Sequence, residues 1–261
     1  MYPVTTRVLA LALLREGHSQ NAVSQRHGIS RAAIREWRDR GVEFKRGPGS
    51  CFRCEPGTAV TDCPNYCALL GFYLGDGCIS RTRSSFALRI SCDAKYRGII
   101  SNVTRLVERV HKGGRACHVN APGAVVVQNC WNHWPCVFPQ HGPGRKHERK
   151  LTLEPWQREI IEAHPADFLR GLFHSDGCRT KNWATRVVRG EKKRYDYPRW
   201  EFVNNSDDIR RWCTEALDLL DIPWRQPGWK TIAVSTRAGV ARLDELIGLK
   251  AEVSDHAGRP A

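Results

Sequence analysis

The sequence predicts an α+β protein with two copies of one αββαββα unit, preceded by a small helical domain and a cysteine-rich segment. The first observation is a repeated motif, Leu69–Gly77 and Leu169–Gly177, whose copies start 100 residues apart. The second is that the same order of helix and strand patterns follows each copy, which indicates a duplication. The third is a change of composition at residues 45–67, where Gly, Pro and Cys interrupt the apolar periodicity.

These changes of pattern predict the domain boundaries. We expect a helix-turn-helix domain at residues 1–46, a zinc knuckle at 47–67, a first repeat at 68–154, a second repeat at 155–250 and a disordered tail at 251–261.

Residues 5–40 carry three short helical patterns typical of a helix-turn-helix. The second helix, with Val23, is expected to end at Gly28, and Ser30 is a suitable N-cap for a third helix that turns Ile34 and Trp37 inward. The first helix has an apolar face made of Val8, Leu9, Leu11, Leu13 and Leu14.

The third helix of this domain carries Arg31, Arg35 and Arg38 on its outer side. A recognition helix meets the major groove of DNA with such a face. The alternative is a small packing module with a solvated basic face. The basic composition of the whole chain favours DNA binding.

Two cysteine pairs follow the linker at residues 45–50. Pairs of this spacing can present four sulfurs to one tetrahedral Zn²⁺ ion, so Cys51, Cys54, Cys63 and Cys67 are the predicted ligands. Free buried cysteines and a redox-active CxxC pair are the alternatives. The short loop between the pairs favours structural zinc.

Each repeat is expected to contain three helices and four strands. In the first repeat we expect a helix at 66–76, strands at 78–81 and 86–92, a helix at 95–110, strands at 117–120 and 124–130, and a closing helix at 154–163. In the second we expect a helix at 166–175, strands near 178–188 and at 200–204, a helix at 207–220, strands at 224–226 and 230–235, and a helix at 238–247.

The motif helices have small residues four apart, which lets two helix backbones approach closely. Each motif ends in an acid, Asp76 or Asp176, where the helix dipole already places negative charge. The glycine after each acid is expected in the left-handed position past a helix end. One copy alone is an ordinary helix end, but two copies predict a helix pair that brings both carboxylates to one site, where divalent cations would offset their repulsion.

This pair of motifs resembles the LAGLIDADG family of homing endonucleases in its single-chain, two-repeat form, over roughly residues 65–250. Asp76 and Asp176 occupy the family's metal-ligand position. The sequence departs from the consensus where Leu70 and Arg170 replace a small residue, and where Tyr73 and His174 precede the final turn.

The resemblance implies a monomeric, pseudo-twofold DNA endonuclease with saddle-shaped antiparallel sheets that lie along the major groove. Asp76 and Asp176 would bind Mg²⁺ for phosphodiester hydrolysis of both strands. Basic residues before the closing helices, Lys150 (or its neighbour Arg149) and Arg237, would offset charge on the phosphates.

Composition agrees with a nucleic-acid partner. The 261 residues include 41 Lys and Arg against 27 Asp and Glu, a formal net charge of +14. No apolar run is long enough for a membrane span and no signal peptide is evident. Eleven cysteines in such a chain indicate reduced thiols and metal ligation, so we expect a cytoplasmic, nucleoid-associated protein.

Basic residues gather on the predicted strands and hairpins, where one sheet face is free to contact duplex DNA. Arg89 and Glu201 are the expected base contacts. The remaining candidates are Arg81, Arg83, Arg186, Arg189, Lys192, Lys193, Arg194 and Arg199, the last six crowding one long hairpin loop together with Tyr195 and Tyr197.

A second His/Cys segment lies between the repeats. His133, Cys136 and His141 have spacing compatible with a metal, with His147 or Cys130 as a fourth ligand. Because this spacing matches no closed tetrahedral pattern, an irregular linking loop is the favoured interpretation.

Two other functions fit the same residues. A transcription regulator could keep this fold only to hold DNA, since fold does not dictate activity. An RNA-splicing cofactor would place structured RNA on the same basic surface. The presence of both acids favours the nuclease.

Overall fold

The computed structural model describes residues 4–41, 51–54, 60 and 62–250. The chain divides into two compact units, Met1–Ser50 and Cys51–Ala261. The predicted linker at 45–50 and the predicted tail at 251–261 lie outside the described residues. None of the described helices is long and apolar enough to span a membrane.

Residues 4–41 of the N-terminal unit contain three helices, α1 (Val4–Arg15), α2 (Gln20–His27) and α3 (Arg31–Arg40). Gly28 ends α2 in the left-handed conformation with φ 64°, and the Ser30 hydroxyl caps α3 by accepting from the Ala33 amide, as predicted. The expected apolar face of the first helix is partly wrong, because Val8 and Leu9 are exposed. The core of this unit consists of Ala10, Val23, Ile29, Ile34 and Trp37.

The larger unit repeats one topology. The strand order is β1-β2-β4-β3 in the first sheet and β5-β6-β8-β7 in the second, antiparallel throughout. The first repeat contains α4 (Cys63–Leu74), β1 (Gly77–Arg81), β2 (Phe86–Asp93), α5 (Arg97–Val110), β3 (Cys117–Ala121), β4 (Ala124–Cys130), the short α6 (Trp134–Val137), the 3-10 turn η1 (Lys146–Glu148) and α7 (Pro155–Ala163). The second contains α8 (Pro165–Asp176), β5 (Gly177–Val188), β6 (Glu191–Val203), α9 (Asp207–Asp218), β7 (Arg225–Gly228), β8 (Thr231–Val234) and α10 (Arg237–Ile247).

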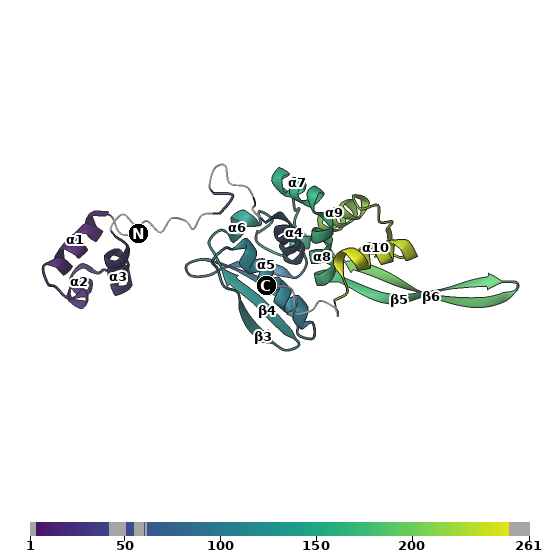
Figure 1. The fold of residues 1–261 in the computed structure, drawn as a ribbon, viewed down its shortest axis with the longest axis horizontal. Helices are drawn as coiled ribbons and strands as arrows, with labels where there is room; N and C mark the ends of the chain where they lie inside the picture. Colours follow the sequence, from purple (N-terminus) through teal and green to yellow (C-terminus); the bar gives the residue numbers. More distant parts are fainter. Residues whose placement is uncertain (1–3, 42–50, 55–59, 61, 251–261) are drawn as a thin grey trace, which may run out of the picture. The chain divides into compact units, whose positions relative to one another are not determined.

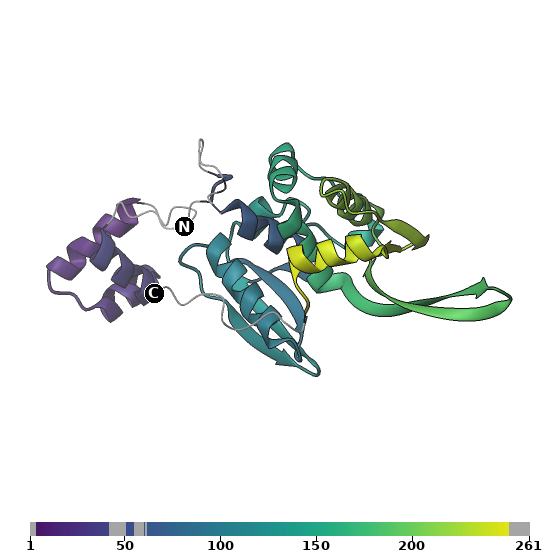
Figure 2. The same cartoon turned by 45° about the vertical axis from the view of Figure 1, so that its right-hand side comes forward.

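Helices α4 and α8 pack against each other between the two sheets (Figures 1 and 2). A Cβ atom built on Gly71 would lie 2.5 Å from the Phe168 carbonyl oxygen and 2.8 Å from the Gly171 Cα. A Cβ on Gly171 would meet the Ala68 carbonyl oxygen in turn. The two backbones therefore touch, and only glycine fits at the crossing. The predicted close approach of the motif helices is confirmed.

The glycines that follow the two acids have a different role from the one predicted. Gly177 is extended, with φ −96° and ψ 161°, and Gly77 begins a strand, so neither is a left-handed cap. A Cβ on Gly77 would lie 2.5 Å from the Tyr73 Cα, and one on Gly177 would lie 2.6 Å from the Phe173 carbonyl oxygen. Each strand folds back tightly against the helix it follows, and a side chain would block that path.

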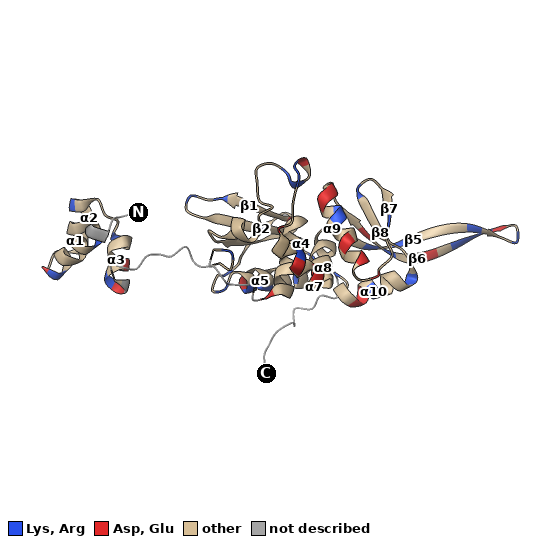
Figure 3. Ribbon diagram, turned by 90° about the horizontal axis from the view of Figure 1, so that it is seen from above, with Lys and Arg blue, Asp and Glu red and all other residues tan. Residues whose placement is uncertain are grey.

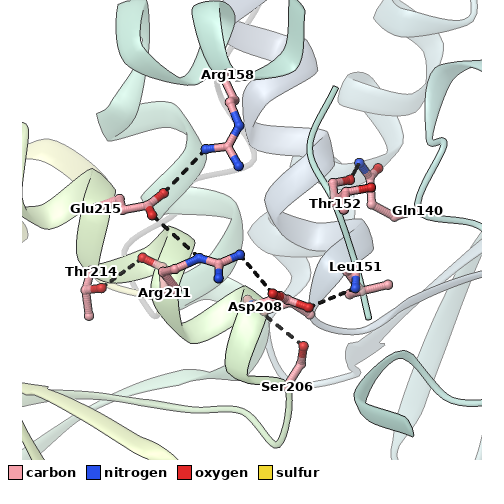
Figure 4. Close-up of polar contacts among 10 residues, drawn as sticks. Gln140, Leu151, Thr152, Arg158, Ser206, Asp208, Arg211, Thr214 and Glu215 are labelled. Carbon is pink, nitrogen blue, oxygen red and sulfur yellow. Dashed lines mark hydrogen bonds and ion pairs between the residues drawn. The ribbon is translucent and has the colours of Figure 1, made fainter. Parts of the chain in front are cut away.

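Polar contacts join the segment before α7 and α7 itself to the second repeat (Figure 4). The Leu151 amide donates to the Asp208 carboxylate at 2.8 Å, and Arg211 donates to the same carboxylate. Glu215 on α9 forms ion pairs with Arg211 of the same helix and with Arg158 of α7. These contacts hold the connection between the repeats against α9.

The predicted long hairpin loop at residues 186–199 is wrong, because these residues are paired strands. β5 and β6 pair without interruption from Gly177–Phe202 to Val188–Glu191. Arg189 (φ 54°) and Gly190 (φ 84°) form a two-residue turn whose positive φ values match the twist of a hairpin. Only the last part of β6 also pairs with β8, so the rest extends as a two-stranded ribbon (Figure 1).

We expect Gly171→Ala to destabilise the larger unit, because the added methyl group has no space at the helix crossing. Overpacking of this kind costs about 2 kcal/mol or more, equivalent to a fall of about 4–8 °C in melting temperature. Thermal unfolding followed by circular dichroism measures it. Gly228→Ala is the matched control, since no atom lies within 4 Å of its Cβ position. Equal melting temperatures for the two variants would contradict the crossing.

Candidate functional site

The two motif acids lie at the same end of the helix pair. Asp76 follows Gly75, the residue that caps α4, and Asp176 is the last residue of α8. A Cβ on Gly75 would lie 3.3 Å from the Asp176 Cγ, so the second carboxyl lies against the backbone next to Asp76. The Asn204 side-chain amide donates to Asp176 at 2.6 Å and orients it. The structure therefore brings together the two carboxylates that the motifs predict.

Two lysines lie beside these acids. The Lys146 Nζ donates to the carbonyl oxygens of Tyr73, Gly75 and Gly77, at 2.5, 3.0 and 2.9 Å. The Lys250 Nζ donates to the Ser175 carbonyl oxygen at 3.0 Å. Each ammonium group thus covers the carbonyl oxygens at the C-terminal end of one motif helix, where the helix dipole favours a cation.

The protonation equilibria reflect this crowding of charge. Desolvation, followed by the nearby Asp76 charge, raises the pKa of Asp176 from its ordinary value to about 6. Desolvation also raises the pKa of Asp76, against the opposing effect of Lys250 and Lys146. Desolvation lowers the pKa of Lys146 to about 8, although both acids counteract it, and lowers the pKa of Lys250. Perturbed acids and bases in one place are typical of functional sites.

The acids open into two pockets of similar size. One pocket, about 590 Å³, contains Asp176 and Lys146, and the other, about 520 Å³, contains Asp76 and Lys250. Each pocket thus pairs an acid from one repeat with the lysine that caps the other repeat's motif helix. This arrangement has the pseudo-twofold symmetry of the helix pair itself.

The lysines beside the acids are not the basic residues expected from the sequence. Lys150 and Arg237 are exposed and line neither pocket, and Arg149 lines the first pocket while donating to the Gln140 carbonyl oxygen. The positions of Lys146 and Lys250 within the repeats offered a signal for this pair. Lys146 follows Asp76 by 70 residues and Lys250 follows Asp176 by 74 residues, although they lie in an irregular loop and past the last helix.

The residues at this site suit a hard divalent cation. Two carboxylates that repel each other, each next to a helix C-terminus, form an oxygen donor set of the kind that Mg²⁺ prefers. Desolvation raises the pKa of both acids, and the Asp76 charge raises that of Asp176 further, so a bound cation would stabilise their ionised forms. Asp76 and Asp176 are therefore the residues that can hold Mg²⁺ here.

The larger unit has the arrangement that the resemblance to the LAGLIDADG family implies, two repeats of identical strand order whose first helices cross at a glycine pair. Residues 2–43 match the family model described as a homeodomain-like domain. A comparison with curated proteins gives no match.

Solved structures similar to this chain include three LAGLIDADG proteins. The N-terminal LAGLIDADG domain of DUF199/WhiA is 14% identical, with 72% of this chain and 83% of that chain covered, at a TM-score of 0.44. I-DmoI in complex with DNA and Mn is 10% identical, with 71% and 97% covered, at 0.47. The meganuclease I-AabMI bound to uncleaved DNA is 14% identical, with 69% and 82% covered, at 0.44.

Each sheet of the larger unit has an open face opposite the helices. Core residues such as Ile90 and Trp200 alternate along the strands with Arg89 and Glu201, which therefore lie on the open face. These two residues occupy equivalent positions, since Arg89 pairs with Cys78 and Glu201 pairs with Cys178. The predicted base-contacting residues thus lie on matching positions of the two open faces.

The register of the hairpin divides its basic residues between two faces. Figure 3 shows Lys and Arg positions along the β5–β6 hairpin. Arg186 and Lys193 are cross-strand partners on the same face as Glu201. Lys192 and Arg194 lie on the opposite face, where Arg194 also pairs with Asp196 and covers the Trp183 ring. Arg189 lies in the turn.

Other predicted DNA contacts have mixed positions. Arg199 is largely buried and pairs with Glu201 at 2.9 Å, so it orients that carboxylate. Arg81 is exposed but covers the Phe86 ring, and Arg83 is exposed in the turn after β1. In the N-terminal unit, Arg31, Arg35 and Arg38 are exposed on α3, as the helical pattern predicts.

The predicted four-cysteine zinc knuckle is corrected by the structure. Cys51 and Cys54 lie with His133 and Cys136, and the four potential ligand atoms are all within 4.8 Å of one another. Among the described residues, Cys63 and Cys67 belong to no such group. The Cys63 thiol contacts the Val60 carbonyl oxygen, and Cys67 is buried in α4 against Ile160. The α4 helix begins at Cys63, and its direction separates these sulfurs from the first pair.

We expect Asp176→Asn to stabilise the metal-free protein above pH 6. The folded-state pKa of about 6 exceeds the unfolded value, so the contribution of Asp176 to stability is complete below about pH 4 and is lost as the pH rises through 6. The neutral amide avoids this loss and should add about 1–2 kcal/mol at pH 8 but little at pH 4. Urea unfolding at both pH values measures the difference. Glu159→Gln, a change at an exposed acid of α7, should show no such pH-dependent gain.

Proposed function

We propose that this chain is a site-specific double-strand DNA endonuclease of the LAGLIDADG homing type, hydrolysing phosphodiester bonds with Mg²⁺. The observation that carries the proposal is the meeting of Asp76 and Asp176 beside Lys146 and Lys250 at one end of the helix crossing. A protein that only holds DNA has no use for two repelling carboxylates where phosphates would lie. Both acids come from one chain, so a monomer supplies the complete site.

Each residue of the site has a distinct task in this proposal. Asp76 and Asp176 hold the cations, and Asn204 keeps the Asp176 carboxylate in place. When bound, Mg²⁺ activates water and stabilises the leaving oxygen. Lys146 and Lys250 offset negative charge on the two scissile phosphates, one in each pocket.

The duplex would lie along the open faces of the two sheets. Arg89 and Glu201 are positioned to contact base edges, while Arg186 and Lys193 lie further out on the hairpin. The homeodomain-like unit would add a second contact through Arg31, Arg35 and Arg38. A basic protein of this kind would reside with chromosomal DNA.

A transcription regulator that retains the fold without cutting is the second candidate. The N-terminal homeodomain-like match favours it, because such domains bind DNA without any catalytic group. A regulator that does not cut DNA would not explain why Asp76 and Asp176 lie together.

Selection from a randomised duplex library tests the proposal directly. The full chain is incubated with the library and Mg²⁺, and both cut ends and bound, uncut duplexes are sequenced. A nuclease yields one enriched cut site, with Ca²⁺ in place of Mg²⁺ as the control that supports binding alone. Enrichment of bound duplexes without cut ends in Mg²⁺ would favour the regulator.

We expect Asp76→Asn and Asp176→Asn each to reduce cleavage of the selected duplex by at least about 1,000-fold, because each removes a cation ligand. Duplex affinity should stay within about threefold of wild type, since losing a negative charge does not weaken phosphate contacts. Plasmid cleavage and fluorescence anisotropy measure the two quantities. Loss of binding in both variants would make these acids structural.

We expect the hairpin to contact the duplex with its open face. The double variant Arg186→Ala/Lys193→Ala should reduce the slope of log affinity against log salt by up to about 0.9 for each phosphate that the protein no longer neutralises. Lys192→Ala/Arg194→Ala removes the same charge from the opposite face and is the matched control. A larger effect from the control would place the duplex on the other face.

A further inference from the structure

A second cluster of potential metal ligands lies where residues 51–54 meet α6. We propose that Cys51, Cys54, His133 and Cys136 bind one structural Zn²⁺ ion, which fastens the first residues of the larger unit to its first repeat. This site is separate from the acid pair, and the proposal holds whether or not the protein cuts DNA.

The distances in the cluster match tetrahedral zinc. With Zn–S bonds of about 2.3 Å, two tetrahedral thiolates lie about 3.8 Å apart, and a thiolate and an imidazole nitrogen about 3.5 Å apart. The Sγ atoms of Cys54 and Cys136 are 3.8 Å apart. The His133 Nδ1 is 3.2 Å from the Cys54 Sγ and 3.8 Å from the Cys136 Sγ.

Two tight turns hold the ligands in place. The Cys54 amide donates to the Cys51 carbonyl oxygen at 2.9 Å, which presents both thiols from one turn. The amides of Cys136 and Val137 donate to the His133 carbonyl oxygen, both at 2.9 Å, where α6 begins. Each turn supplies two ligands with two residues between them, a spacing typical of zinc ligands.

The donor set distinguishes zinc from the alternatives. Three thiols and one imidazole, without a carboxylate, suit a soft or borderline ion such as Zn²⁺ rather than Mg²⁺. Four protein ligands leave no open position, so the site is structural rather than catalytic. A redox-active CxxC pair would have no need of His133 and Cys136 at ligand distance.

The ion would hold an aromatic cluster together. Phe52, between the first two ligands, packs edge-on against Tyr66 and Trp156 at centroid distances of 6.0 and 5.4 Å. The Tyr66 hydroxyl donates to the Val137 carbonyl oxygen next to the last ligand. Residues 51–54 contain no helix or strand, so cross-linking them to α6 would fix Phe52 over the start of α4.

Metal analysis of the purified full chain tests the proposal. The protein is prepared in reducing buffer without chelator, and its metals are measured by plasma mass spectrometry. We expect one zinc per chain, falling below one-tenth in Cys51→Ser and in Cys136→Ser. Cys63→Ser is the matched control and should keep its zinc, because that thiol contacts the Val60 carbonyl oxygen instead.

The variant His133→Cys, which replaces one zinc ligand by another, distinguishes loss of a ligand from misfolding. It should retain zinc, and after replacement by Co²⁺ its thiolate-to-metal absorption should grow in proportion to a rise from three thiolates to four. Hydrogen exchange should show that a zinc chelator exposes residues 51–54 and 131–138 but leaves α9 protected.

Three results would overturn the proposal. Wild-type protein without zinc after incubation with the metal is the first, and a Cys51–Cys54 disulfide in the protein as isolated is the second. The third is loss of zinc from Cys63→Ser while Cys136→Ser retains it, which would restore the four-cysteine knuckle.

Discussion

The contact between Gly71 and Gly171 fixes the geometry of the larger unit. Because a Cβ on either glycine would overlap the opposite backbone, α4 and α8 can cross only at this point. The crossing brings the C-terminal ends of both helices together, and each helix leads directly into the first strand of its sheet. The positions of the acids and of both sheets therefore follow from the two glycines at the crossing, Gly71 and Gly171.

This geometry creates an electrostatic conflict that the rest of the fold only partly relieves. Two helix C-termini and two carboxylates converge, and desolvation together with the Asp76 charge raises the pKa of Asp176 to about 6. Lys146 and Lys250 bring positive charge from distant loops, at the cost of desolvating their own ammonium groups. A site that violates local electrostatic preference in this way is where function is expected.

The sequence predicted the features that depend on local pattern or on repetition. The caps at Gly28 and Ser30 and the order of helices and strands follow from residues close together in the chain, and the helix crossing follows from the repeated motif. The proposed zinc ligands did not, because Cys51-x2-Cys54 and His133-x2-Cys136 are two half-sites, and spacing alone cannot show that they meet. Lys146 and Lys250 were missed for the same reason. The strand pair at residues 186–199 was predicted as a loop because its residues are mostly charged. Strand propensity describes side chains that suit a half-buried sheet, and this ribbon has both faces in water.

The two halves are unequal in reach. β5 has 12 residues and its counterpart β1 has 5, lengths of about 40 and about 17 Å at about 3.3 Å per residue. Duplication inside one polypeptide permits such divergence, which identical subunits of a homodimer cannot undergo separately. A ligand that follows both sheets therefore meets a long arm on one side and a short arm on the other. A protein with two unequal halves has no reason to prefer a palindromic binding site.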